Sequence, residues 1–157
     1  NQLPEKYNVI SSIEKVGFSE YYREMGLSRI FVSPSGWCEY TPKDYEAMYF
    51  RSLLIKPCVE HIDTHPDILF PNETYVPVKW DLSDLQEKVQ YYLENHEERE
   101  RIAENAHRAY VDYFQRKVFL EKMEEIVDFL GRDSGNNAVP SHADFELVSP
   151  VRHLKAV

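Results

Sequence analysis

The chain has 157 residues, of which 43% are hydrophobic and 13% aromatic, a composition typical of one folded domain with a buried core. The formal net charge of −9 argues against a nucleic-acid partner or an anionic membrane surface, because phosphate groups are bound by clustered Lys and Arg. No apolar run is long enough to cross a bilayer and no secretory signal pattern opens the sequence, so we expect no membrane span and a cytoplasmic location.

The N-terminal part of the sequence contains two apolar runs separated by a helical pattern. Residues 7–10 are compatible with a short strand, and residues 19–25 with a short helix that ends at Gly26. A further strand is predicted over residues 30–33, because this apolar run is bounded by turn-forming residues.

A helix is expected from about residue 42 to residue 50, since the residues before it favour a helix N-terminus. Thr41 suits the N-cap, Pro42 suits the first helical position, and Asp44 stands where the acid of a capping box is found. The next apolar run, residues 53–56, predicts a second strand. The loop and helix then connect two buried parallel strands.

The middle of the chain is rich in His, Asp and Pro, and predicts little regular structure. Residues 58–74 are expected to form a short helix and a loop. Residues 75–78 alternate like a strand, and Pro77 places that strand at an edge of the sheet, because proline cannot donate a ladder hydrogen bond.

The C-terminal half predicts three helices, each with an apolar stripe that we expect to face the core. The first stripe is Leu82, Leu85, Val89, Tyr92 and Leu93, and Asp81 or Ser83 is the expected N-cap of this helix. The second stripe is Ile102, Ala106, Ala109, Tyr110 and Tyr113. The third is Phe119, Met123, Ile126, Val127 and Leu130, in a helix expected to end at Gly131. The charged run of residues 94–104 is interpreted as a solvated helix face. We divide the chain into a domain of residues 1–131 and a polar tail of residues 132–157, expected to be extended or poorly ordered.

Strands that alternate with helices and are followed by terminal helices predict an α/β fold. We expect a Rossmann-like parallel sheet with right-handed crossovers, followed by two or three terminal helices. Only three or four strands are found, so the sheet corresponds to part of a larger doubly wound one. In such sheets, ligands bind outside the carboxyl ends of the strands.

Two carboxylates, Glu39 and Glu46, stand in the loop and the helix that follow the strand of residues 30–33. Acidic residues near a helix start often only complement the helix dipole, so one interpretation of both is structural. The functional interpretation depends on Ser35, Gly36 and Trp37, which give this loop a flexible backbone and a large flat ring. A helix N-terminus attracts phosphate and carboxylates accept hydrogen bonds from hydroxyls, a combination that fits a sugar nucleotide.

Three sequence blocks resemble the C-terminal, donor-binding domain of GT-B glycosyltransferases, in particular the glycosyl-transferases-group-1 branch with the CgeB-like proteins. The resemblance extends from about residue 28 to residue 114, in the order and spacing of that family. The blocks are SPSGWCE (33–39) with DYEAM (44–48), NETYVPV (72–78) with WDLSDL (80–85), and RIAENA (101–106).

The resemblance implies transfer of a sugar from a UDP- or GDP-sugar to a glycan or other acceptor, with retention of anomeric configuration and without a metal or other cofactor. In related enzymes, two acids separated by seven residues span this loop and helix. By that resemblance, Glu46 binds the ribose hydroxyls and Glu39 contacts the donor sugar. Here the spacing is one residue shorter, and Cys38 stands at the first position of the pair. The Ser35, Gly36 and Trp37 loop is expected to shape the sugar pocket.

Lys43 and His61 complete the predicted site. Lys43 either neutralises the diphosphate or is a solvated lysine on the helix face, and His61 either contacts the donor or is a surface histidine. Cys58, His61 and His65 have spacings compatible with zinc, but no fourth ligand is spaced for a closed tetrahedral site, so no metal is predicted. The two cysteines are expected to be reduced.

A non-catalytic interaction or scaffolding module of the same fold is the main alternative. It is favoured by the short acid spacing, by the absence of the Gly-Gly pair that many relatives carry after the second strand, and by the lack of an acceptor-binding domain in this sequence. The block that contains Glu46 favours the enzyme. A flavodoxin-like binding domain is a third alternative, since fold alone does not determine function. Without the acceptor domain, the isolated chain is expected to be inactive.

Overall fold

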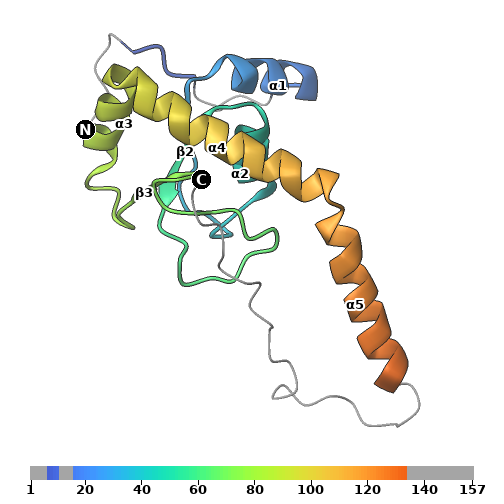
Figure 1. Ribbon diagram of the computed structural model, residues 1–157. Coiled ribbons are helices and arrows are strands. Elements are labelled where there is room, and N and C mark those ends of the chain that lie inside the picture. The colour runs from blue at the N-terminus through green and yellow to red at the C-terminus, as the bar shows by residue number, and fades with distance from the viewer. Residues whose placement is uncertain (1–6, 11–15, 134–157) are drawn as a thin grey trace. The chain divides into compact units, whose positions relative to one another are not determined.

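The computed structural model describes residues 7–10 and 16–133, and the chain divides into a unit of residues 1–119 and a unit of residues 120–157. The elements, in chain order, are α1 (Phe18–Leu27), β1 (Ile30–Val32), α2 (Pro42–Tyr49), β2 (Leu53–Pro57), β3 (Val76–Val78), α3 (Leu85–Glu94), α4 (His96–Gln115) and α5 (Val118–Asp133) (Figure 1). The structure confirms the predicted α/β class.

A three-stranded parallel sheet in the order β1-β2-β3 forms the centre of the first unit. Ile30 pairs with Leu53, and Ile55 pairs with Val76. β3 lies at an edge of this sheet, as Pro77 predicts. Because all three strands are parallel, their carboxyl ends lie at one edge, and we call this the carboxyl edge of the sheet.

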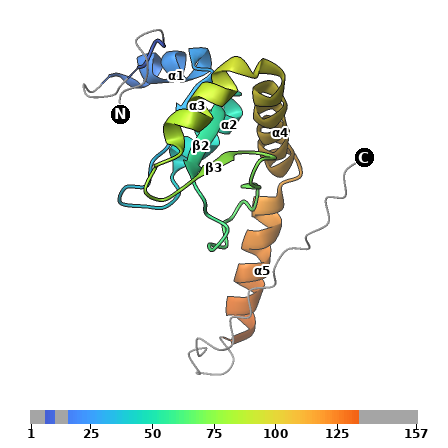
Figure 2. The same ribbon diagram turned by 90° about the vertical axis from the view of Figure 1, so that its left-hand side faces the viewer.

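Two apolar clusters cover the two faces of the sheet, because successive strand residues point to opposite sides. Figures 1 and 2 show α4 alongside α2 and the sheet, and α4 contributes a buried residue to each cluster. The first cluster contains Met25, Ala47, Met48, Leu54, Val59, Ile68, Leu69, Tyr75 and Ala106; the second contains Leu53, Ile55, Val76, Val78, Val89, Tyr92 and Ile102.

The helix after β3 begins later than predicted. α3 starts at Leu85 with Asp84 as its N-cap, and Leu82 precedes it with a φ of 57°. Asp81 does not cap the helix, because its carboxylate instead accepts a hydrogen bond of 3.0 Å from the backbone N–H of Ser83. Such an Asx turn competes locally with helical hydrogen bonds.

Two other predicted elements are wrong. Residues 7–10 form no strand, and residues 58–74 form turns and irregular backbone without a helix. In the second segment, the hydroxyl of Thr74 donates to the carbonyl of Ile68 at 2.6 Å and accepts from the N–H of Phe70 at 2.8 Å. These side-chain bonds satisfy the backbone without a helix.

The charged run at the start of α4 is only partly a solvated face. Glu97 and Glu100 are exposed as predicted, but Glu98 is half-buried and Arg99 is buried. Its Nη1 donates a hydrogen bond of 3.0 Å to the carbonyl oxygen of Tyr92. Arg99 therefore satisfies one of the last carbonyls of α3 and stabilises the connection between α3 and α4.

The apolar stripe of α5 is exposed, which contradicts the prediction that it faces a core. The helix also continues past Gly131 to Asp133. The side chains concerned are 41–61% exposed: Phe119, Met123, Ile126, Val127 and Leu130. Helical spacing determines which residues share a face, but does not determine whether another element covers that face.

The prediction for the polar tail falls almost entirely outside the described residues, and the domain division at residue 131 stays a prediction. Within the described ranges, no helix has both the length and the apolar character needed to cross a membrane.

Candidate functional site

The carboxyl edge of the sheet brings together side chains from the loops after all three strands. His61, after β2, has its Nε2 2.6 Å from Oε2 of Glu39, which follows β1. The ring centroid of His61 is 5.7 Å from that of Trp80, which follows β3. The three residues, which we call the carboxyl-edge cluster, are each about half exposed and therefore accessible to a ligand.

This cluster has the functional groups that bind a polyhydroxylated ring. The carboxylate of Glu39 accepts hydrogen bonds, the imidazole of His61 has one nitrogen for each role, and the indole of Trp80 offers a flat apolar face. The sequence predicts Glu39 and His61 as separate site residues and does not predict Trp80. The position of Trp80, two residues after the end of β3, was the signal that pointed to it.

A buried ion pair lies beside this loop and was also missed. Lys56 Nζ is 2.6 Å from Asp44 Oδ2, and the two side chains are 1% and 0% exposed. Asp44 also accepts hydrogen bonds from the hydroxyl of Ser33 at 2.6 Å and from the N–H of Thr41 at 3.0 Å, the latter being the predicted capping contact. Lys56 donates a second bond, of 2.8 Å, to the backbone oxygen of Glu39.

The sequence contained a signal for this pair. Lys56 stands in an apolar run whose five residues are all buried. A buried ammonium requires a charged or strongly polar partner, because removal from water is otherwise too costly. The partner was not recognised, because Asp44 was interpreted as a capping acid alone.

The predicted sugar-pocket loop is open to solvent. Ser35, Gly36 and Trp37 are all exposed, with the Trp37 side chain fully so, and no hydrogen bond or ring contact joins them to the carboxyl-edge cluster. A Cβ added to Gly36 would meet no atom within 4 Å. Local space therefore does not require glycine at this position.

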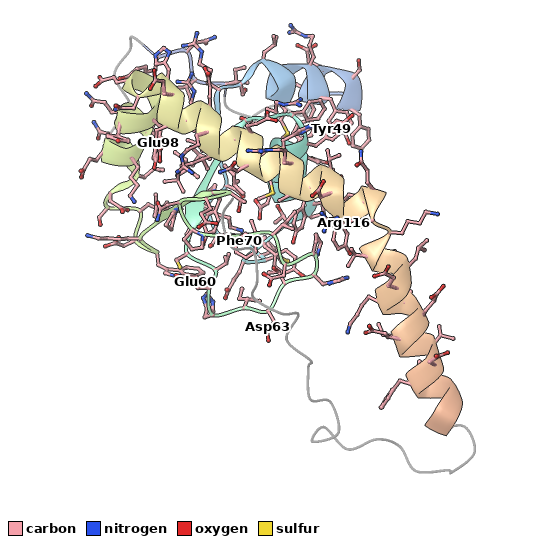
Figure 3. The ribbon with its side chains drawn as sticks, in the orientation of Figure 1. Tyr49, Glu60, Asp63, Phe70, Glu98 and Arg116 are labelled. Carbon is pink, nitrogen blue, oxygen red and sulfur yellow. The ribbon has the colours of Figure 1, made fainter. Side chains whose placement is uncertain are left out.

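Glu46 lies outside the carboxyl-edge cluster, where α2 faces α1. Its carboxylate accepts a hydrogen bond of 2.7 Å from the hydroxyl of Tyr21 and a longer one, of 3.4 Å, from that of Tyr22. Figure 3 shows Glu60, the neighbour of His61 in the chain, well away from Tyr49, which lies where α2 meets α4. Glu46 also lines a shallow hollow of about 450 Å³. The hollow is lined by Tyr22, Glu46, Tyr49, Phe50 and Tyr110.

Lys43 is exposed on the first turn of α2. Its Nζ lies 6.0 Å from the ring centroid of Tyr21, a distance at which cation–π attraction acts. Lys43 is therefore on the Glu46 side of the helix start.

Three tyrosines determine how stability depends on alkaline pH: Tyr75 is buried, and Tyr21 and Tyr45 are half-buried. Burial first, and then the hydrogen bond to Glu46, raise the pKa of Tyr21 above its ordinary value of 10.0, and burial likewise raises the pKa of Tyr45 and Tyr75. Their contribution to stability is thus fully present below pH 10 and is lost above it, where the unfolded chain releases phenol protons that the folded chain retains. We expect the Tm to fall steeply above that pH, and less steeply in Tyr21→Phe. The Tm of the wild type and of Tyr21→Phe is measured by circular dichroism as a function of pH. If the Tm of both proteins falls equally with pH, Tyr21 does not contribute to this loss of stability.

The three candidate zinc ligands have three different partners. His61 contacts Glu39, His65 Nε2 lies 2.9 Å from the hydroxyl of Tyr113, and the Cys58 thiol lies 3.2 Å from Glu60. In the part of the chain that the structure describes, no three His, Cys, Asp or Glu side chains are grouped to hold a metal ion. Both cysteines are free thiols.

Known proteins resemble this chain at the level of sequence. The chain is 40% identical over 60 residues to Uncharacterized protein 179R of Invertebrate iridescent virus 6, a stretch that covers 38% of the chain and 5% of the viral protein. No solved structure matches the chain. The sequence profile of the family described as glycosyl transferase-like matches residues 4–125, which include the whole parallel sheet and the carboxyl-edge cluster. The chain therefore belongs to the glycosyl transferase-like family.

Proposed function

We propose that this chain is the donor-binding domain of a GT-B glycosyltransferase of the CgeB-like branch, and that it binds a nucleotide-diphosphate sugar. The observation that supports this is the convergence of Glu39, His61 and Trp80 from the loops after all three parallel strands. Ligands of open parallel sheets bind at this edge. A carboxylate, an imidazole and an indole provide hydrogen bonds for sugar hydroxyls and a surface for the apolar face of the ring.

The donor would extend from the carboxyl-edge cluster along the first turn of α2 to Glu46. In this arrangement Glu39 and His61 hold the sugar, and Trp37 and its loop border it. At the start of α2, Pro42 has no N–H, and the N–H groups of Thr41 and Asp44 are already bonded within the turn. The ammonium of Lys43 therefore holds the diphosphate and stabilises the charge that develops on it as the leaving group. Glu46 accepts hydrogen bonds from the ribose hydroxyls.

The proposed role of Glu46 is supported by its present partners. Two phenol hydroxyls already donate to this carboxylate, and the longer bond, from Tyr22, is the one that a ribose hydroxyl would replace. The aromatic rings that line the adjoining hollow offer surfaces on which a planar base can stack. Retention of anomeric configuration, and an acceptor bound by a separate N-terminal domain, are part of the same proposal.

We expect Glu46→Ala to weaken nucleotide-sugar binding at least about tenfold, because hydrogen bonds to a charged group contribute about 1.5–3 kcal/mol each. The measurement is calorimetric titration of the chain with UDP, GDP, UDP-glucose and GDP-mannose. Glu87→Ala is the matched control, since Glu87 is an exposed glutamate on α3. It is expected to bind like the wild type.

Two outcomes would contradict these assignments. Equal losses in Glu46→Ala and Glu87→Ala would remove the specific role of Glu46. A folded wild-type chain that binds none of the four compounds would contradict the donor-domain proposal and favour a non-catalytic interaction module. That second candidate is favoured by the exposed apolar side chains of α5, such as Met123 and Val127, which would suit a protein partner.

A further inference from the structure

The loop between β1 and α2 is held to the sheet at a few defined points. At its start, the N–H of Ser33 donates to the carbonyl of Ile55 at 2.9 Å, and the hydroxyl of Ser33 donates to Asp44. At its end, the N–H of Thr41 donates to Asp44. Between these points, the backbone is held at Glu39, whose carbonyl oxygen accepts a bond of 2.8 Å from Lys56 Nζ.

Lys56 acts on this loop from the protein interior. Its side chain is 1% exposed, so its ammonium does not reach a ligand at the surface. The same ammonium is paired with Asp44 at 2.6 Å, which orients it toward the loop. Asp44 itself lies in the first turn of α2, so β2, the helix start and the loop are joined through one buried cation.

The anchored residue is the one whose side chain enters the carboxyl-edge cluster. The backbone of Glu39 is fixed by Lys56, and its carboxylate then meets His61 at 2.6 Å. Residues 35–37 of the same loop are exposed and have no hydrogen bond to the sheet within the described ranges. Without the bond from Lys56, no hydrogen bond within the described residues would hold the loop backbone between Ser33 and Thr41, and only the side-chain contact with His61 would hold Glu39.

We propose that Lys56 is a positioning residue: it fixes the backbone at Glu39 so that the Glu39 carboxylate faces the sugar of the bound donor. This inference rests on the proposed donor-binding function. It assigns to Lys56 an effect on recognition of the sugar and no effect on recognition of the nucleotide, because Lys56 does not contact Glu46 or Lys43.

The test variant is Asp44→Asn with Lys56→Met. It removes both charges together, since a buried pair can often be replaced by neutral side chains without loss of stability, whereas removal of one partner leaves an unpaired charge. Ser33→Ala is the matched control, because it removes one hydrogen bond to Asp44 and leaves both the ion pair and the Lys56 bond to Glu39. If the double variant does not fold, Asp44→Asn with Lys56→Gln replaces it, since glutamine also lacks the ammonium and is shorter.

The first readout is the NMR order parameter of the backbone amides of Glu39 and Tyr40. In the wild type and in Ser33→Ala we expect values near 0.85, typical of rigid backbone, and in the double variant values below about 0.6. The amides of β2 report whether the fold is intact. Unchanged order at Glu39 in a folded double variant, or equal loss of order in Ser33→Ala, would overturn the proposal.

The second readout separates sugar from nucleotide. The affinities for UDP and UDP-glucose, or for GDP and GDP-mannose, are measured by titration, and their ratio gives the contribution of the sugar. In the double variant, as in Glu39→Ala, we expect this ratio to fall about tenfold, because a hydrogen bond to a charged group is lost, while the affinity for the nucleoside diphosphate stays within about twofold. Equal weakening of both ligands would show a purely structural role for Lys56. If the wild type binds none of them, the proposed function fails, and the order parameters alone decide whether Lys56 anchors Glu39.

Discussion

Replacement of Lys56 by Met is expected to lower the free energy of unfolding by about 3–5 kcal/mol, among the largest effects of any single substitution in this chain. The ammonium of Lys56 is the only cation paired with the buried carboxylate of Asp44 among the described contacts. Its removal leaves a negative charge in a site that is 0% exposed. The hydrogen bonds from Ser33 and Thr41 remain but do not neutralise it. Urea denaturation followed by circular dichroism measures the change.

Two variants identify the cause of that loss. Asp44→Asn with Lys56→Met is expected to recover most of the stability, because no unpaired charge then remains. Lys79→Met, at an exposed lysine, is expected to change stability by less than about 0.5 kcal/mol. A loss below about 1 kcal/mol in Lys56→Met would show that the carboxylate reaches water or another cation, and would contradict the buried pair.

Replacement of Ile102 by Ala is expected to cost about 2–5 kcal/mol, through lost burial and the cavity that remains. Ile102 is 0% exposed and belongs to the apolar cluster that contains Ile55 and Val89, so its side chain joins α4 to β2 and α3. The loss should appear as a lower urea midpoint with an unchanged slope, since the extent of surface exposed on unfolding stays the same.

Ile126→Ala is the matched control for Ile102→Ala. Both residues were predicted to face a core, but Ile126 is 43% exposed on α5 and Ile102 is fully buried. We expect Ile126→Ala to change stability by less than about 0.5 kcal/mol. A cost comparable to that of Ile102→Ala would mean that the apolar face of α5 is covered in solution.

The sequence predicted most of the fold because local patterns decide it. The apolar run at β2 and the helical stripe of α4 correspond to buried faces, and the run at β1 forms the predicted strand but is half-buried. The capping residues at Thr41 and Pro42 locate the start of α2. The errors occur where a tertiary or side-chain contact decides. The Asx turn at Asp81 delays α3, and the hydroxyl of Thr74 holds a turn where a helix was expected.

The candidate site was predicted less completely than the fold, since its contacts join residues far apart in the chain. Parallel strands indicate the edge at which ligands of such sheets bind, and this edge, together with the family resemblance, led to the prediction of Glu39 and His61. Their contact links positions 22 residues apart and depends on two irregular loops, which no periodicity describes. The contact of Trp80 with His61 also depends on irregular loops and cannot be predicted from periodicity. Nor does periodicity predict that Glu46 lies apart from the carboxyl-edge cluster.

The buried pair of Asp44 and Lys56 also constrains how this protein can evolve. Loss of either charge alone leaves the other buried and unpaired, which lowers the free energy of unfolding, whereas loss of both leaves no unpaired charge. The effects of the two substitutions on stability are therefore strongly non-additive. A lineage that exchanges this pair for apolar residues must cross a poorly folded intermediate, or first acquire stabilising substitutions elsewhere. Directed evolution that accumulates single changes should therefore retain both residues, even when selection acts on stability alone.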